Sequence, residues 1–191
     1  MALEHRISEL DTYLFAKGTH YEIYEKMGAH LAEEDGKAGT YFSVWAPNAR
    51  SVSVVGDFNN WDRTAHPMQP VQQSGIWDIF VPGVKAGDLY KFAVETSQGY
   101  TVLKADPYGN QSQLRPDNAS VVADIRYFDW TDQAWRKAHQ EKKTESPMAI
   151  YEVHPGSWKK DPSMPGEFYN FKKLAVELAD YVLEMGIRMW S

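Results

Sequence analysis

The sequence contains no cysteine. This excludes disulfide bonds, thiolate catalysis and cysteine-ligated zinc, and it is typical of proteins in the reducing cytoplasm. No apolar stretch approaches the roughly 18 residues of a membrane span, and the first residues lack the apolar core of a signal peptide. We therefore predict a soluble protein with a cytoplasmic location and no membrane partner.

A concentration of positive charge is also absent. Lysine and arginine together number 20 against 26 acidic residues, giving a formal net charge of −6, and the basic residues are dispersed apart from short pairs. A surface for nucleic acid is therefore not expected. The central part of the chain shows no alternation of strands with helices, so a nucleotide-binding α/β sheet is a poor fit, and we predict no cofactor.

Aromatic residues, by contrast, are abundant, with seven tryptophans and eleven tyrosines. Their flat faces suit a sugar-binding surface, although most of them are expected to belong to the core. In residues 1–27, apolar side chains recur at spacings of three and four, which predicts an N-terminal helical segment with a helix that ends near Gly18. These apolar residues are Leu3, Ile7, Leu10, Leu14 and Phe15.

From residue 28 the apolar period becomes that of a strand. Short alternating segments are separated by turn signals about every ten residues, which predicts a mainly β fold: an immunoglobulin-like antiparallel β-sandwich over residues 28–128. Trp45 and Trp77 lie inside such segments and are predicted to be core residues. The segments are 39–47, 51–56, 76–81 and 88–95.

Two further regions complete the predicted organisation. Residues 129–146 are predicted to form a short helix and a linker, and residues 147–191 a strand, a proline-rich loop and an amphipathic helix with Asn170 as N-cap and Gly186 as its stop. This is one strand-helix unit of a (β/α)8 barrel, which needs roughly 250 residues. The predicted barrel is therefore incomplete. The apolar face of the helix comprises Phe168, Phe171, Leu174, Leu178, Tyr181, Val182 and Met185.

Several motifs occur in an order that resembles a known family. Residues 51–62 read SVSVVGDFNNWD, and YKF at 90–92, KADPY at 104–108 and RPDNAS at 115–120 follow. Together they resemble the glycogen-binding module family 48 that precedes the barrel in bacterial glycogen branching enzymes. IYEVH at 150–154 resembles the first barrel strand of those enzymes, which are members of glycoside hydrolase family 13.

The resemblance implies the N-terminal fragment of a 1,4-α-glucan branching enzyme of glycogen biosynthesis. The parent reaction transfers an α-1,4-glucan segment to a C6 hydroxyl through a glycosyl intermediate on a carboxylate. The family's catalytic carboxylates lie beyond Ser191, so no catalytic residue is expected here and the chain alone is predicted to be inactive. Two departures are Pro155, where a larger apolar residue is common, and residues 188–191, which do not resemble the second barrel strand and indicate a truncation.

Candidate acids and bases within the chain have simpler explanations. Glu152 and His154 lie two residues apart on one strand face, as an acid/base pair or two metal ligands could, but two ligands are too few for zinc. We interpret them as polar contacts at the barrel mouth and predict no metal site. Asp57 and Asp62 flank the Asn-Asn turn and are interpreted as turn-capping carboxylates.

Sugar binding is a more specific hypothesis than acid/base catalysis or metal binding. A glucan offers apolar faces and hydroxyl groups, so its site needs an aromatic platform and side chains that donate and accept hydrogen bonds. By resemblance, Trp61, Lys91 and Asn118 fall on sugar-contacting positions, and Tyr100 or Leu103 falls on a second platform position. The alternative role for Trp61 is packing of the module against the barrel.

The predicted partners are α-glucans, namely glycogen and malto-oligosaccharides, and the remainder of the catalytic barrel. Two alternatives to the branching-enzyme fragment stay open at this point. One is a stand-alone weak α-glucan-binding module, and the other is an immunoglobulin-like interaction domain without sugar binding. Exposure of the aromatic side chains around Trp61 would favour the first over the second.

Overall fold

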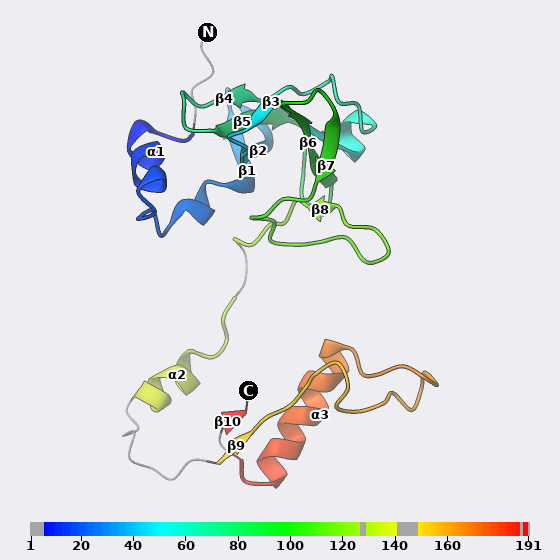
Figure 1. The fold of residues 1–191 in the computed structure, drawn as a ribbon. Coiled ribbons are helices and arrows are strands. Elements are labelled where there is room, and N and C mark those ends of the chain that lie inside the picture. Colours follow the sequence, from blue (N-terminus) through cyan, green and yellow to red (C-terminus); the bar gives the residue numbers. More distant parts are fainter. Residues whose placement is uncertain (1–5, 127–128, 141–148, 188, 191) are drawn as a thin grey trace. The chain divides into compact units, whose positions relative to one another are not determined.

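A computed structural model describes residues 6–126, 129–140, 149–187 and 189–190 (Figure 1). The chain divides into two compact units, Met1–Asp129 and Trp130–Ser191. Three predicted features lie outside the described residues: Leu3, the linker from residue 141 onward, and the beginning of the predicted strand at 147–148. None of the helices in the described ranges has the length and apolar character needed to cross a bilayer.

The N-terminal unit contains two antiparallel sheets (Figure 1). The first has the strand order β1-β2-β5-β4, and the second has the order β3-β6-β7 with β8 also paired to β6. This arrangement confirms the mainly β, immunoglobulin-like fold. The strands are β1 Gly28–Glu34, β2 Lys37–Trp45, β3 Ala49–Gly56, β4 Gln69–Pro70, β5 Ile76–Pro82, β6 Leu89–Thr96, β7 Thr101–Lys104 and β8 Ser120–Val121.

The main core lies between the two sheets. Alternate residues of each strand point inward, because successive side chains of a strand face opposite sides. Phe42 of β2 packs edge-on against Tyr90 of β6 with ring centroids 5.0 Å apart, and Tyr90 contacts Phe92 at 5.8 Å. Val52 and Val54 of β3 complete this part of the core.

The N-terminal segment forms a second, smaller core against the sandwich. Helix α1, Glu9–Ala16, is capped by Ser8, and the single 3-10 turn Ile23–Glu25 follows it. The helix thus ends close to the predicted Gly18 but begins later than the apolar pattern suggested. Its flanking residues pack against β5 and the preceding loop in a cluster of Ile7, Ile23, Met27, Val71 and Ile76.

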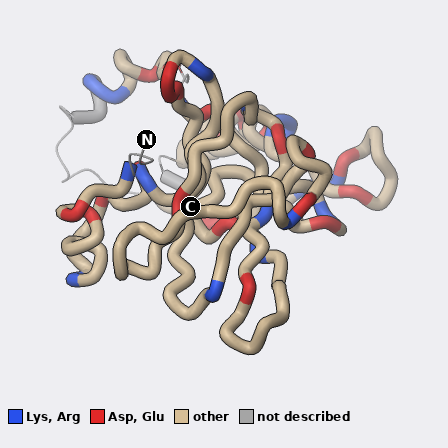
Figure 2. Tube along the Cα trace, turned by 90° about the horizontal axis from the view of Figure 1, so that it is seen from above, with Lys and Arg blue, Asp and Glu red and all other residues tan. Residues whose placement is uncertain are grey.

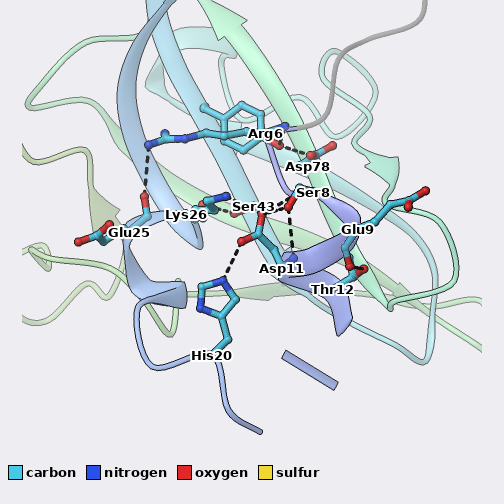
Figure 3. A network of polar contacts seen from close by, with 11 residues as sticks. Arg6, Ser8, Glu9, Asp11, Thr12, His20, Glu25, Lys26, Ser43 and Asp78 are labelled. Carbon is cyan, nitrogen blue, oxygen red and sulfur yellow. Dashed lines mark hydrogen bonds and ion pairs between the residues drawn. The ribbon is translucent and has the colours of Figure 1, made fainter. Parts of the chain in front are cut away.

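A network around the buried Asp11 supports this segment (Figure 3). The Asp11 carboxylate accepts hydrogen bonds from Ser8, from Lys26 Nζ at 2.5 Å and from His20 Nε2 at 2.8 Å. Burial pushes the pKa of Asp11 upward, but these three partners outweigh it and hold the pKa well below its usual value. The network therefore stabilises the folded state above the usual carboxylate pKa and loses this contribution as the pH falls through the lowered value.

The prediction that Trp45 is a core residue is wrong, because 52% of its surface is exposed. Val44 points into the intersheet core, so its neighbour Trp45, at the end of β2, faces the opposite side. Phe15 of α1 packs edge-on against it there, with ring centroids 5.9 Å apart. Trp77 is partly buried against the core, as predicted, and its indole N–H donates to the carbonyl of Ala46 at 3.1 Å.

The C-terminal unit contains a strand-helix-strand arrangement (Figure 1). Strand β9, Ile150–Tyr151, pairs in parallel with β10, Met189–Trp190, and helix α3, Phe171–Glu184, connects them. Such units repeat in parallel barrels. The short helix α2 is Gln133–Gln140, within the region predicted to contain a helix.

Both predicted ends of α3 are confirmed. The side chain of Asn170 accepts the backbone N–H of Lys173 at 3.0 Å, and Gly186 takes a left-handed conformation with φ of 66° directly after the helix. The predicted apolar face is only partly correct. Its buried members are Leu174, Leu178 and Val182, whereas Phe171 and Met185 are 78% and 58% exposed.

Candidate functional site

Trp61 lies on a tight turn that follows the end of β3. The 3-10 turn η2, Asp57–Asn59, begins directly after Gly56, and the backbone N–H of Trp61 donates to the Gly56 carbonyl at 2.9 Å. A Cβ atom at Gly56 would overlap the carbonyl oxygen of Leu89, so only glycine fits there. Because position 56 is glycine, the backbone can approach β6 closely at the point where η2 begins.

The backbone of this turn is strained. Asn60 and Trp61 have φ angles of 51° and 60°, so two consecutive non-glycine residues occupy the left-handed region. Each such residue costs about 1 kcal/mol, and the conformation persists only where neighbouring contacts enforce it. The backbone N–H groups of Asn60 and Trp61 contribute by donating to the carbonyls of Asp57 and Gly56, and side-chain contacts of Asn59 add to them.

Asn59 ties the turn to the sheet. Its side-chain oxygen accepts the Gly56 N–H at 2.9 Å, and its amide nitrogen lies 3.0 Å from the Val54 carbonyl and 2.8 Å from His66 Nδ1. The sequence indicates Asn59 only as part of a turn, and His66 is not among the predicted site residues. The available signal was the Asn-Asn pair, which indicates a turn but not its partners.

The indole of Trp61 is half-buried, and its N–H donates to Asp57 Oδ1 at 3.1 Å. Asp57 therefore orients the ring from the first position of η2. Asp62 has the predicted turn-capping role, since its Oδ1 accepts both the backbone N–H and the hydroxyl of Thr64 at 2.8 Å. These bonds lower the pKa of Asp62.

Lys91 and Asn118 are brought into direct contact. Lys91 Nζ donates to Asn118 Oδ1 at 2.5 Å, although the residues are separated by 27 positions in the chain. Lys91 pairs with Val55 of β3, and its neighbour Tyr90 pairs with Gly56. Because Gly56 begins the turn that carries Trp61, all three predicted residues lie at the same end of the second sheet.

Tyr100 lies at the opposite end of β6 from Lys91, in the hairpin that β6 forms with β7. It is 55% exposed in the turn between β6 and β7, and its carbonyl accepts the N–H of Thr96. Thr96 lies five positions after Lys91 on β6, a distance of roughly 17 Å along a strand. Leu103, the other candidate for the second platform position, is 41% exposed. It pairs with Ala93, two residues from Lys91, so it lies much closer to Lys91 than Tyr100 does.

Glu152 and His154 are both exposed, and His154 Nδ1 lies 2.7 Å from the Ser157 hydroxyl. The interpretation of Glu152 and His154 as polar contacts at the barrel mouth stays a prediction. Within the described ranges, no group of three or more histidine, aspartate or glutamate side chains could hold a metal ion. Figure 2 shows acidic and basic residues interspersed along the described parts of the trace.

Comparison with known families identifies the sandwich. Residues 26–109 match carbohydrate-binding module 48, the isoamylase N-terminal domain. The match includes η2, Trp61, Lys91 and Tyr100, and it ends before Asn118.

Curated relatives resemble nearly the whole chain. It is 52% identical over 179 residues to the 1,4-alpha-glucan branching enzyme GlgB of Protochlamydia amoebophila, covering 93% of this chain and 24% of that protein. For GlgB of Butyrivibrio fibrisolvens the identity is 49% over 181 residues, covering 94% and 28%. The chain thus spans about a quarter of the length of the relatives it matches.

Solved structures agree on the fold. A putative alpha amylase from Salmonella typhimurium aligns with a TM-score of 0.59 and 22% identity, over 86% of this chain and 24% of that one. The catalytic module of the pneumococcal glycogen-degrading virulence factor SpuA aligns with a TM-score of 0.60 and 23% identity, over 86% and 26%. The chain therefore contains a family 48 carbohydrate-binding module and is homologous to the N-terminal region of the bacterial 1,4-α-glucan branching enzymes.

Proposed function

We propose that this chain supplies the α-glucan-binding part of a 1,4-α-glucan branching enzyme that acts in glycogen biosynthesis in the cytoplasm. The binding surface comprises Trp61, Lys91 and Asn118, with Tyr100 at the far end of the hairpin. The observation that carries the proposal is the joining of Lys91 and Asn118 at the sheet end where the Trp61 turn begins. The absence of cysteine supports a cytoplasmic location.

The residues supply the chemistry that a glucan requires. The partly exposed indole of Trp61 offers an apolar face for one sugar ring, Lys91 donates hydrogen bonds, and the Asn118 amide both donates and accepts them. Covering one sugar face is worth about 1 kcal/mol, and each net hydrogen bond about 1 kcal/mol more. With three or four such bonds, the expected affinity for a malto-oligosaccharide is about millimolar.

Trp61→Ala is expected to abolish most of the retardation that the chain shows in a native gel cast with glycogen. The variant loses the apolar platform, and at about 1 kcal/mol the affinity falls roughly fivefold. Tyr21→Ala provides a matched control, because Tyr21 is 84% exposed on the N-terminal segment and should keep wild-type mobility. Equal mobility of the wild type with and without glycogen would favour the interaction-domain alternative.

Branching itself is proposed to require the remainder of the barrel as a partner. A retaining transfer needs two carboxyl groups about 5 Å apart across the glycosidic bond, set on barrel strands that residues 147–191 do not supply. The purified chain is therefore expected to leave the iodine absorbance of amylose unchanged over hours. A progressive fall in absorbance with chain concentration would contradict this prediction.

A further inference from the structure

His66 contacts the turn that carries Trp61 from the loop leading to β4. It is half-buried, its carbonyl accepts the backbone N–H of Val54 at 3.1 Å, and its ring packs edge-on against Phe58 with centroids 5.7 Å apart. Its Nδ1 atom lies 2.8 Å from the side-chain nitrogen of Asn59. The imidazole therefore packs against η2, while the backbone of His66 bonds to β3.

The hydrogen bonds of Asn59 determine the protonation state of this histidine. Because the Gly56 N–H must find an acceptor, the atom of Asn59 that faces it at 2.9 Å is the oxygen. The other end is then the amide NH2 group, whose two hydrogens point to the Val54 carbonyl and to His66 Nδ1. His66 Nδ1 must accept, so the imidazole is neutral and carries its proton on Nε2.

We propose that neutral His66 is a positioning residue for the Trp61 platform, and that protonation of its Nδ1 atom loosens the turn and weakens α-glucan binding. This inference rests on the proposed function. A protonated Nδ1 faces the Asn59 amide as a second donor, so the two groups repel each other. Asn59 must then rotate and release either Gly56 or Val54, which removes one of the contacts that help to hold Asn60 and Trp61 in the left-handed region.

The surroundings of His66 set the pH range. Burial of the ring lowers the pKa of His66 below its usual value of 6.5, and the nearby Asp62 opposes this shift. The other charged side chains of these segments, Asp57 of η2 and Arg63 of the loop, are exposed. Because the folded state favours the neutral form, the turn is intact at pH 7 and loosens as the pH falls through a value below 6.5.

The test follows the Trp61 indole N–H and the His66 ring by NMR from pH 7.5 to 4.5, first without ligand and then with maltoheptaose. Both resonances are expected to titrate with the same midpoint. The dissociation constant for maltoheptaose should rise about fivefold across that midpoint, as expected for the loss of one net hydrogen bond. An indole resonance that stays constant while His66 titrates would overturn the inference.

Substitution provides an independent measurement. In His66→Gln the side-chain oxygen can accept from Asn59 but cannot gain a proton, so binding at pH 7.5 should be retained and its pH dependence lost. His154→Gln, an exposed histidine of the other unit, is the matched control and should keep the wild-type midpoint. Persistence of the wild-type pH dependence in His66→Gln would overturn the inference.

The two proposals fail in different ways. If maltoheptaose leaves the Trp61 resonance unchanged at pH 7.5, the proposed function is wrong, because His66 is neutral there and the platform is intact. If maltoheptaose shifts that resonance but its affinity is the same on both sides of the His66 midpoint, only the positioning role of His66 is wrong.

Discussion

Phe42→Ala is expected to destabilise the N-terminal unit by about 4 kcal/mol. The Phe42 side chain is fully buried between the sheets, where it contacts Tyr90 at 5.0 Å and stacks on Phe58 of η2 at 5.9 Å. Truncation removes the transfer free energy of the ring and leaves a cavity that a close-packed core fills only in part. The measurement is the free energy of unfolding in urea, followed by the fluorescence of the sandwich tryptophans.

The same substitution tests how the core supports the site. Because Phe58 belongs to the turn before Trp61, loss of its stacking partner should also broaden the Trp61 indole resonance in the folded state. Leu114→Ala is the matched control, since Leu114 is 89% exposed and its truncation should change the stability by less than about 0.5 kcal/mol. A destabilisation by Phe42→Ala below 1 kcal/mol would show that the ring does not support the core.

The sandwich was predictable from the sequence because its short segments alternate in side-chain size and are separated by turn signals, as the strands of an antiparallel sheet are. The caps of α3 were predictable for a similar reason, since Asn170 and Gly186 act on backbone groups within one turn. Trp45 shows the limit of the pattern. Alternation identifies two faces but not how far each is covered, and at the end of β2 the packing of Phe15 leaves about half of the Trp45 surface exposed.

The candidate site was predictable only in its residue types. The resemblance selected Trp61, Lys91 and Asn118, whereas the strand register, which depends on contacts distant in sequence, distinguishes the locations of Tyr100 and Leu103. The contact between Asn59 and His66 was not predictable either. It depends on how the loop after η2 returns to β3, and no local propensity encodes that path.

The second large effect on stability is expected at Asp106, whose buried carboxylate contacts Tyr90 of the second sheet. Asp106 accepts the Tyr90 hydroxyl at 2.6 Å and the Tyr108 N–H at 2.8 Å, and its own N–H donates to the Ser120 hydroxyl. Asp106→Ala leaves the buried Tyr90 hydroxyl and the part-buried Tyr108 N–H without this acceptor, and an unsatisfied buried donor costs about 1–3 kcal/mol. The expected loss of stability is about 3 kcal/mol, measured by urea unfolding at pH 7.

The Asp106→Asn variant distinguishes the effect of the buried charge on stability from the effect of the hydrogen bonds. Burial raises the pKa of Asp106, although Tyr90, Tyr108 and the nearby His30 partly oppose the shift. The folded state therefore binds more protons than the unfolded state above the usual value of 3.8, so the contribution of Asp106 to stability falls as the pH rises through this range. Asparagine keeps an acceptor for Tyr90 but does not ionise. The stability of Asp106→Asn relative to the wild type should accordingly increase between pH 4 and pH 7, and a decrease over the same range would mean that the buried charge itself stabilises the fold.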